Sequence, residues 1–114
     1  MNIKNYNEIQ KNIRSITIKV IKFYKGNEPD YVNVKINDGK IEMFAKGILS
    51  KFVEFLIKYD EITVVELSRR KLQSILYKYL IDEILKETNL KCELIYEEYN
   101  FISNFVRVIL IIKE

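Results

Sequence analysis

The first regular pattern of hydrophobic and polar positions covers residues 16–24. Ile16, Ile18 and Val20 share one face, while Thr17 and Lys19 share the other. An alternation of period two with β-branched residues predicts a half-buried strand. The turn residues from 26 to 30 then predict a hairpin loop, and a second alternation over residues 32–36 predicts the partner strand.

Apolar residues at helical spacing begin after Asn37-Asp38-Gly39, a stretch that can cap a helix. This spacing predicts a first helix over residues 41–59. A short apolar strand is expected at residues 62–67, and Ser68 is expected to cap a second helix that ends near Thr88. The apolar positions of the second helix have the spacing of one buried stripe: Leu72, Ile75, Leu76, Tyr79, Leu80 and Ile84.

The last part of the chain has the pattern of a hairpin. Residues 90–99 alternate between apolar and polar positions, and residues 100–104 form a turn. Residues 105–113 are apolar on both faces except at Arg107. A strand of this kind is expected to lie centrally in a sheet or in a subunit interface.

This order of elements predicts an α+β protein. We expect a two-layer sandwich with a β-α-β-α-β-β core, a mixed sheet and both helices on one face, plus an extra N-terminal strand. Residues 1–114 are expected to form a single domain, in which residues 1–30 are a strand extension and residues 31–114 are the core.

Composition narrows the class of protein. The chain has no histidine and one cysteine, Cys92. An internal disulfide and a zinc site of Cys and His ligands are therefore excluded, and Cys92 is expected to be a small buried side chain. Because a histidine base, a Gly-rich phosphate loop and a serine elbow are all missing, we expect no enzyme and no cofactor.

The expected location follows from the apolar runs, which are too short to span a bilayer, and from the first 15 residues, which lack a secretory core. We therefore expect a cytoplasmic protein with no membrane partner. Abundant Ile, Lys, Glu and Tyr suggest a thermophile, although an AT-rich genome would leave a similar composition. The net charge of +3 is uneven, since residues 1–25 carry six basic side chains against one acidic.

The main candidate site is the triplet Arg69-Arg70-Lys71, placed by this interpretation where a strand turns into a helix. The start of a helix carries free N–H groups and the positive end of the dipole, so cations there are unfavourable unless they hold an anion. A phosphate is the simplest such anion. The alternative is a solvated basic turn beside Glu66.

Residues 31–113 resemble the Alba family of archaeal chromatin proteins. The resemblance rests on the stretch TVVELSRRKL from Thr63 to Leu72, and on VKINDGKIEMFA from Val34 to Ala45 at the opening of the predicted first helix. It implies a homodimer that binds DNA and RNA through phosphates with little sequence preference. Arg69 and Lys71 fall on the two arginines of the family's basic turn, and Arg70 replaces the glycine between them.

The implied function is a nucleic-acid-binding protein of chromatin or RNA, associated with the nucleoid, with double-stranded DNA or RNA as partner. The candidate contacts are Arg69, Arg70, Lys71, Lys40, Lys19, Lys22 and Arg107. Two departures are visible: the family's lysine pair falls on Asp38 and Gly39, and the hairpin is acidic. Two alternatives therefore remain, a non-catalytic protein–protein interaction subunit, and an RNA-binding domain like the C-terminal domain of a bacterial translation initiation factor.

Overall fold

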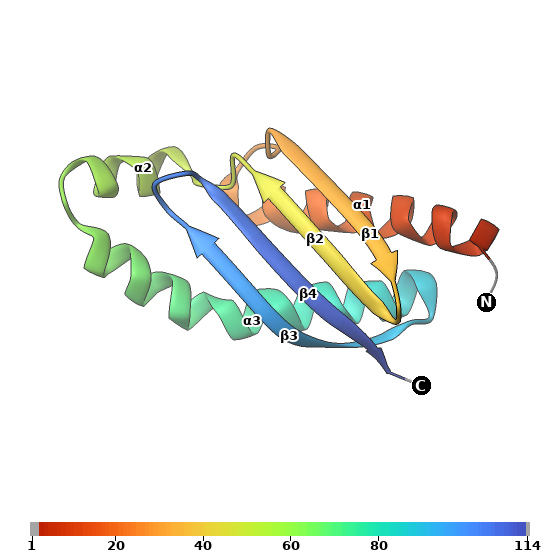
Figure 1. The fold of residues 1–114 in the computed structure, drawn as a ribbon. Helices are drawn as coiled ribbons and strands as arrows, with labels where there is room; N and C mark the ends of the chain where they lie inside the picture. Colours follow the sequence, from red (N-terminus) through yellow and green to blue (C-terminus); the bar gives the residue numbers. More distant parts are fainter. Residues whose placement is uncertain (1–2, 114) are drawn as a thin grey trace.

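Three helices and four strands follow one another along residues 3–113, the part of the chain that this computed structural model describes. Their order is α1 (Ile3–Lys25), β1 (Tyr31–Asn37), β2 (Lys40–Lys46), α2 (Lys51–Lys58), α3 (Ile62–Thr88), β3 (Lys91–Asn100) and β4 (Phe105–Lys113). The strands form one antiparallel sheet in the order β1-β2-β4-β3 (Figure 1). The α+β class is confirmed, whereas the β-α-β-α-β-β order and the mixed sheet are wrong.

The predicted N-terminal strand is wrong, because residues 3–25 form the helix α1. The isoleucines that alternate over residues 16–20 belong to a longer series with three- and four-residue spacing. Its buried members are Ile9, Ile13, Ile16, Val20 and Ile21. This spacing places them on one face of a helix, which packs against β1 and α3.

A hairpin replaces the opening of the predicted first helix. β1 confirms the strand expected there, and Asp38 and Gly39 follow it with φ angles of 51° and 73°. Two successive positive φ angles are what a two-residue type I′ turn requires, and Asp-Gly is a strong signal for it. β2 then returns antiparallel along β1, with Ile41, Met43 and Ala45 buried beneath the helices.

The rest of the predicted first helix is the short helix α2. Ser50 caps it by accepting a hydrogen bond from the Val53 N–H at 3.1 Å. The N–H groups of Ile48 and Leu49 donate to the side-chain oxygen of Asn104 at 2.8 Å and 3.0 Å. The turn between β3 and β4 therefore fixes the point where the chain leaves the sheet for α2.

The predicted strand at residues 62–67 is also wrong, because α3 begins at Ile62. Val65 in this segment is buried and lines the groove between α3 and α2. Its packing continues the buried stripe of the helix, so tertiary contacts override the strand propensity of valine and threonine.

The remaining strands agree with the sequence pattern. β3 and β4 form the expected hairpin, and β4 lies centrally, between β2 and β3. Cys92 is buried, as expected. The single domain over residues 1–114 stays a prediction.

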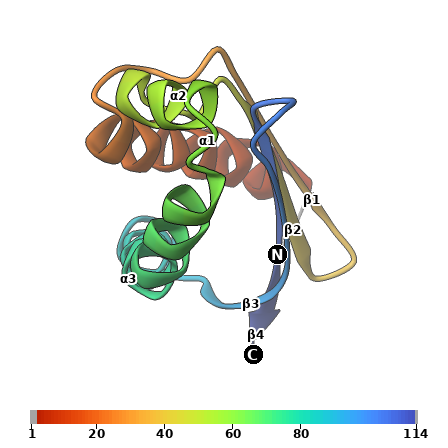
Figure 2. The same cartoon turned by 90° about the vertical axis from the view of Figure 1, so that its left-hand side faces the viewer.

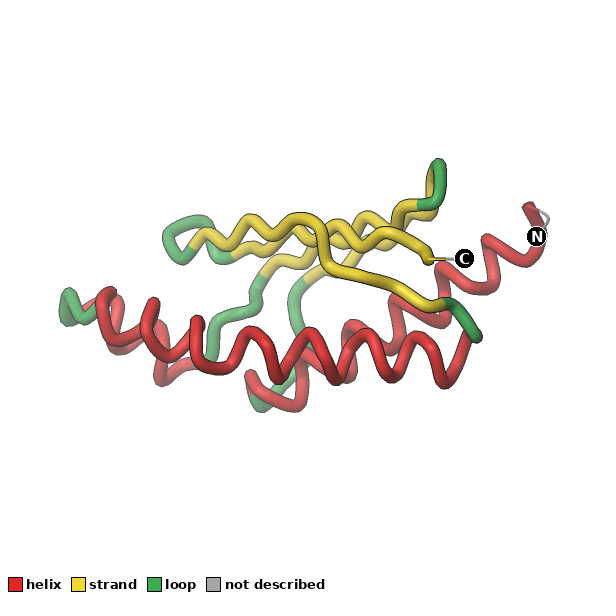
Figure 3. The backbone as a smooth tube through the Cα atoms, turned by 90° about the horizontal axis from the view of Figure 1, so that it is seen from below, coloured by secondary structure: helices red, strands yellow, loops and turns green. Residues whose placement is uncertain are grey.

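The molecule has two layers, with all three helices on one face of the sheet (Figure 2). The core between the layers is built on fully buried residues from both: Ile13, Ile41, Ile48, Ile84 and Leu110. Seen from below, the α2–α3 connection extends past the ends of the strands (Figure 3). The opposite face of the sheet has no cover from the described residues.

α1 also satisfies the outer edge of β1. The Arg14 Nε donates to the Val32 carbonyl at 3.0 Å, and the Ile36 N–H donates to the side-chain oxygen of Gln10 at 2.8 Å. An edge strand with unpaired backbone groups is a template for unwanted pairing, so these bonds protect it.

Candidate functional site

The basic triplet lies inside α3 and not at its start. Because α3 begins at Ile62, Arg69 is two turns into the helix, where the backbone N–H groups are already bonded within the helix. The expected cluster of cations with free N–H donors does not form. Arg69 turns toward the sheet, whereas Arg70 and Lys71 are exposed.

Arg69 forms a partly buried ion pair with Glu97 of β3. Its Nη2 also lies 3.3 Å from the Tyr77 hydroxyl, and its guanidinium lies 4.3 Å from the centroid of the Tyr99 ring. Tyr77 donates its hydroxyl proton to Glu97, and the Gln73 side-chain amide donates to the same carboxylate at 3.1 Å. One carboxylate thus accepts from three side chains of α3.

The surroundings favour the charged form of Arg69 and the protonated form of Tyr77. The side chains of Arg69 and Glu97 are 17% and 15% exposed. Burial alone would lower the pKa of the Arg69 guanidinium, but Tyr77 and Glu97 outweigh it and raise that pKa. Burial, followed by the hydrogen bond to Glu97, raises the pKa of the Tyr77 phenol. This network fastens α3 to β3, and it leaves Arg69 unavailable to a phosphate.

Glu97 reaches the helices because β3 contains a bulge. The pairing with β4 shifts register between Leu94 and Tyr96. After a bulge the side chains exchange faces, so Glu97 turns inward and Tyr96 turns outward. The simple alternation in the sequence placed these two the other way round. No clear signal for this is present in the sequence, because the same strand carries two further glutamates, Glu93 and Glu98, that stay exposed.

The other predicted contacts are spread over the molecule. Lys19 and Lys22 are exposed on α1, and Lys40 is exposed beside the β1–β2 turn. Arg107 is exposed on the open face of the sheet, with its guanidinium 5.4 Å from the centroid of the Phe44 ring. These cations lie on different elements and on both sides of the sheet, so they do not make one surface for a polyanion.

A second feature is an exposed apolar surface on the helices. We call it the helical-layer surface, and its residues are Phe23, Phe52, Phe55, Tyr59, Leu72, Ile75 and Tyr79. The exposed fractions of Phe23, Phe52 and Ile75 are 84%, 69% and 63%. Contiguous exposed apolar surface of this kind marks a contact with a partner or a membrane.

The three helices bring this surface together. Phe23 of α1 stacks on Tyr79 of α3 with ring centroids 6.5 Å apart, and the rings of Phe55 in α2 and of Tyr59, the residue that caps its C-terminal end, are 4.6 Å apart. Phe52 and Leu72 line the same groove between α2 and α3. The surface was missed because the sequence pattern assigned Phe52, Leu72, Ile75 and Tyr79 to buried stripes.

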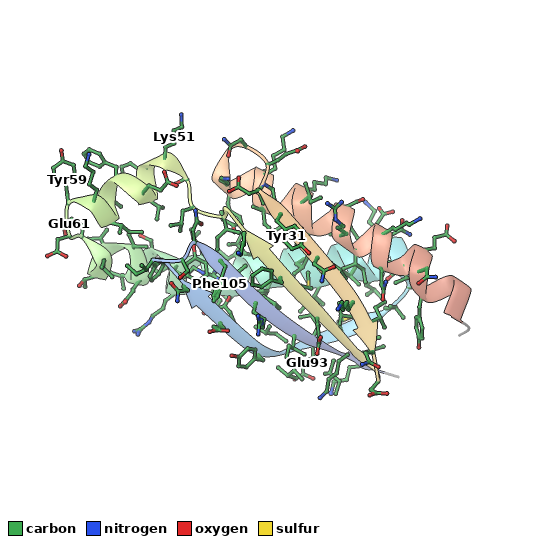
Figure 4. All side chains as sticks on the ribbon, turned by 45° about the horizontal axis from the view of Figure 1, so that its top comes forward. Tyr31, Lys51, Tyr59, Glu61, Glu93 and Phe105 are labelled. Carbon is green, nitrogen blue, oxygen red and sulfur yellow. The ribbon has the colours of Figure 1, made fainter. Side chains whose placement is uncertain are left out.

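The open face of the sheet is of mixed character (Figure 4). Tyr31 and Phe105 lie on it with Phe44, whose ring is 6.3 Å and 5.5 Å from theirs. Charged residues occupy the neighbouring positions, including Lys35 opposite Glu42. Aromatic and charged side chains therefore lie next to one another on this face.

Across residues 3–113, no group of three or more His, Cys, Asp or Glu side chains could hold a metal ion. None of the helices in this part of the chain combines the length and the apolar character that crossing a bilayer requires.

Comparison with known families identifies the chain. The family model described as "Na+-translocating membrane potential-generating system (MpsC)" matches residues 5–114. No curated protein and no solved structure matches the chain.

This match overturns the resemblance to the Alba family and what it implied. DNA or RNA binding, a chromatin role and nucleic-acid partners are wrong, because the matching family is described by Na⁺ translocation and membrane potential. The nucleoid-associated cytoplasmic location and the absence of a membrane partner are wrong for the same reason. The resemblance relied on a strand, a basic turn and a helix within residues 62–88, and this stretch is one continuous helix, α3. The match covers almost the whole chain, and the chain therefore belongs to the family of the Na⁺-translocating membrane potential-generating system (MpsC).

Proposed function

We propose that this protein takes part in generating a membrane potential by Na⁺ translocation. The observation that carries the proposal is the family match over residues 5–114, which spans all three helices and all four strands. The exposed helical-layer surface supports it, because a component of a membrane system needs a surface for contact with the rest of that system.

The role that we propose is non-catalytic. The partly buried carboxylate of Glu97 is occupied by Arg69, Tyr77 and Gln73 and serves to hold α3 on the sheet. A general acid or base must reach a substrate, and these groups reach each other. The chain contributes through contact between surfaces.

The test is a measurement of membrane potential in cells of the source organism. A voltage-sensitive dye reports the potential during a step in external Na⁺, in the wild type, in a strain that lacks this gene and in the strain with the gene restored. We expect the Na⁺-dependent part of the potential to fall in the deletion strain and to return on restoration. An unchanged response to Na⁺ in the deletion strain would overturn the proposal.

A further inference from the structure

We propose that the helical-layer surface docks on the surface of a lipid bilayer, with its aromatic side chains in the headgroup region. The inference rests on the proposed function in one respect, namely that the chain works at a membrane. It goes further by naming the surface and the lipid as its occupant. The residues of α2 and α3 carry the argument.

α2 has the properties of a helix that lies in a membrane interface. None of its eight residues is buried. Phe52, Phe55 and Tyr59 follow at intervals of three and four residues and form one stripe, and they are 69%, 55% and 62% exposed. Helical spacing places Lys51 and Lys58 beside this stripe, where their alkyl chains can lie along apolar surface while their ammonium groups reach phosphates.

α3 repeats this arrangement on the other side of the groove. Leu72, Ile75 and Tyr79 form its exposed apolar stripe. Helical spacing places Lys71 and Lys78 beside the stripe, and both lysines are exposed. Since Phe52 and Leu72 line the groove between the helices, the apolar residues meet in the middle and the lysines flank them.

Lysines flank the two stripes, while acidic residues lie away from them or at their ends. Four exposed lysines border the stripes, and Glu54 lies on the side of α2 away from Phe52, as its two-residue separation requires. Asp60 and Glu61 lie in the α2–α3 connection and Asp82 at the far end of the α3 stripe, and all three are exposed. Lysines at the edge of an apolar surface complement the negative potential of a bilayer that contains anionic lipids.

The shape of the molecule permits such contact. The α2–α3 connection extends past the ends of the strands (Figure 3), and Lys51 and Tyr59 project from α2 away from the sheet (Figure 4). The open sheet face fits a bilayer less well, because Glu42 and Glu98 lie among its aromatic residues and would lose their water.

The test is flotation of the purified chain with vesicles. Vesicles of phosphatidylcholine with about 30% phosphatidylglycerol supply an anionic surface, and pure phosphatidylcholine supplies the neutral comparison. We expect the chain to float with the anionic vesicles. Phe52→Ser combined with Ile75→Ser should weaken binding about tenfold or more for each apolar side chain removed. Because both residues are largely exposed, the variant should keep its circular dichroism spectrum.

Two further variants complete the test. Tyr31→Ser removes an aromatic that is 51% exposed on the opposite face, and it should float like the wild type. Lys51→Gln combined with Lys71→Gln should weaken binding to the anionic vesicles and leave the weaker binding to the neutral ones unchanged.

The docking proposal fails if the wild type floats with neither vesicle, or if the Phe52 and Ile75 variant floats as the wild type does. It also fails if sedimentation shows that this surface is buried in a pair of copies that does not float. A chain that floats while its deletion leaves the Na⁺-dependent potential intact would overturn the proposed function and leave the docking proposal standing.

Discussion

Removing the charge of Glu97 should destabilise the fold far more than removing a similar charge from the surface. In Glu97→Gln the side chain keeps its shape, and the amide oxygen can still accept from Tyr77. The guanidinium of Arg69 then remains 17% exposed with no carboxylate to balance it. An uncompensated buried charge is costly because the protein interior solvates it poorly.

The burial of the Arg69–Glu97 pair sets the size of the expected loss in the free energy of unfolding. Breaking a fully buried pair costs about 3–5 kcal/mol. Since water still reaches part of both side chains, we expect a loss of about 2–4 kcal/mol in the free energy of unfolding. For a chain of this length the entropy of unfolding is about 0.24 kcal/mol per kelvin, so Tm should fall by about 8–17 °C.

Glu93→Gln is the matched control on the same strand. Glu93 pairs with Lys113 at 2.8 Å, but the two side chains are 60% and 52% exposed. An exposed pair contributes about 0–1 kcal/mol, so Tm should change by about 4 °C at most. Thermal unfolding followed by circular dichroism measures both variants, and equal shifts for the two would refute the account of the buried network.

Three other perturbations test the fold. Ile13→Ala, at a fully buried position of α1, should lower the free energy of unfolding by about 2–5 kcal/mol, measured by urea denaturation. Ile102→Ala, at a position that is 80% exposed, should lower it little. A small loss in both variants would contradict the core role of α1. Gly47→Ala should destabilise the protein more than Gly26→Ala. Both glycines have a positive φ, but of the two only Gly47 lies where an added Cβ would overlap a carboxylate, that of Asp30. Equal losses of stability in the two variants would count against this close packing. Burial raises the pKa of the Cys92 thiol to about 11. Stability should therefore fall as pH rises from the unfolded pKa of about 8.5 toward that value, because only the unfolded thiol ionises there, and Cys92→Ala should remove this part of the fall.

Part of the fold could be predicted from the sequence because its local signals agree with the final contacts. The alternation over residues 32–36 and the apolar run over 105–113 predicted the correct strands. Neither stretch has a competing helical pattern among its neighbouring residues. Cys92 was correctly placed inside because a lone cysteine in an alternating strand behaves as a small apolar side chain.

Other elements were wrong where two patterns share the same residues. Ile16, Ile18 and Val20 alternate like a strand, yet Ile13, Ile16 and Val20 have helical spacing, and the contact with α3 decides between them. Asp38-Gly39 can cap a helix or turn a hairpin. For α1 the deciding contacts are distant in the sequence, so a local pattern could not supply them, whereas the hairpin is fixed by the pairing of β2 with β1 and β4.

The candidate site was harder to predict than the fold. The interpretation of the basic triplet as a phosphate site required residues 62–67 to form a strand, so that the triplet would lie at the start of a helix. Because these residues are helical, the triplet lies inside α3. The inward direction of Glu97 depended on a bulge that leaves no trace in the alternation. The exposed apolar surface was missed because Leu72, Ile75 and Tyr79 were assigned to one buried stripe with Leu80 and Ile84, although the five residues together cover an arc of α3 wider than one buried face.

Restoration of the Na⁺-dependent membrane potential in the deletion strain tests most directly whether the protein works through its helical-layer surface. Wild-type protein and the Tyr31→Ser variant should restore it, whereas Phe52→Ser combined with Ile75→Ser should fail at equal protein level, because the surface that docks on the bilayer is lost. Full restoration by the Phe52 and Ile75 variant would contradict the claim that this protein works through its helical-layer surface.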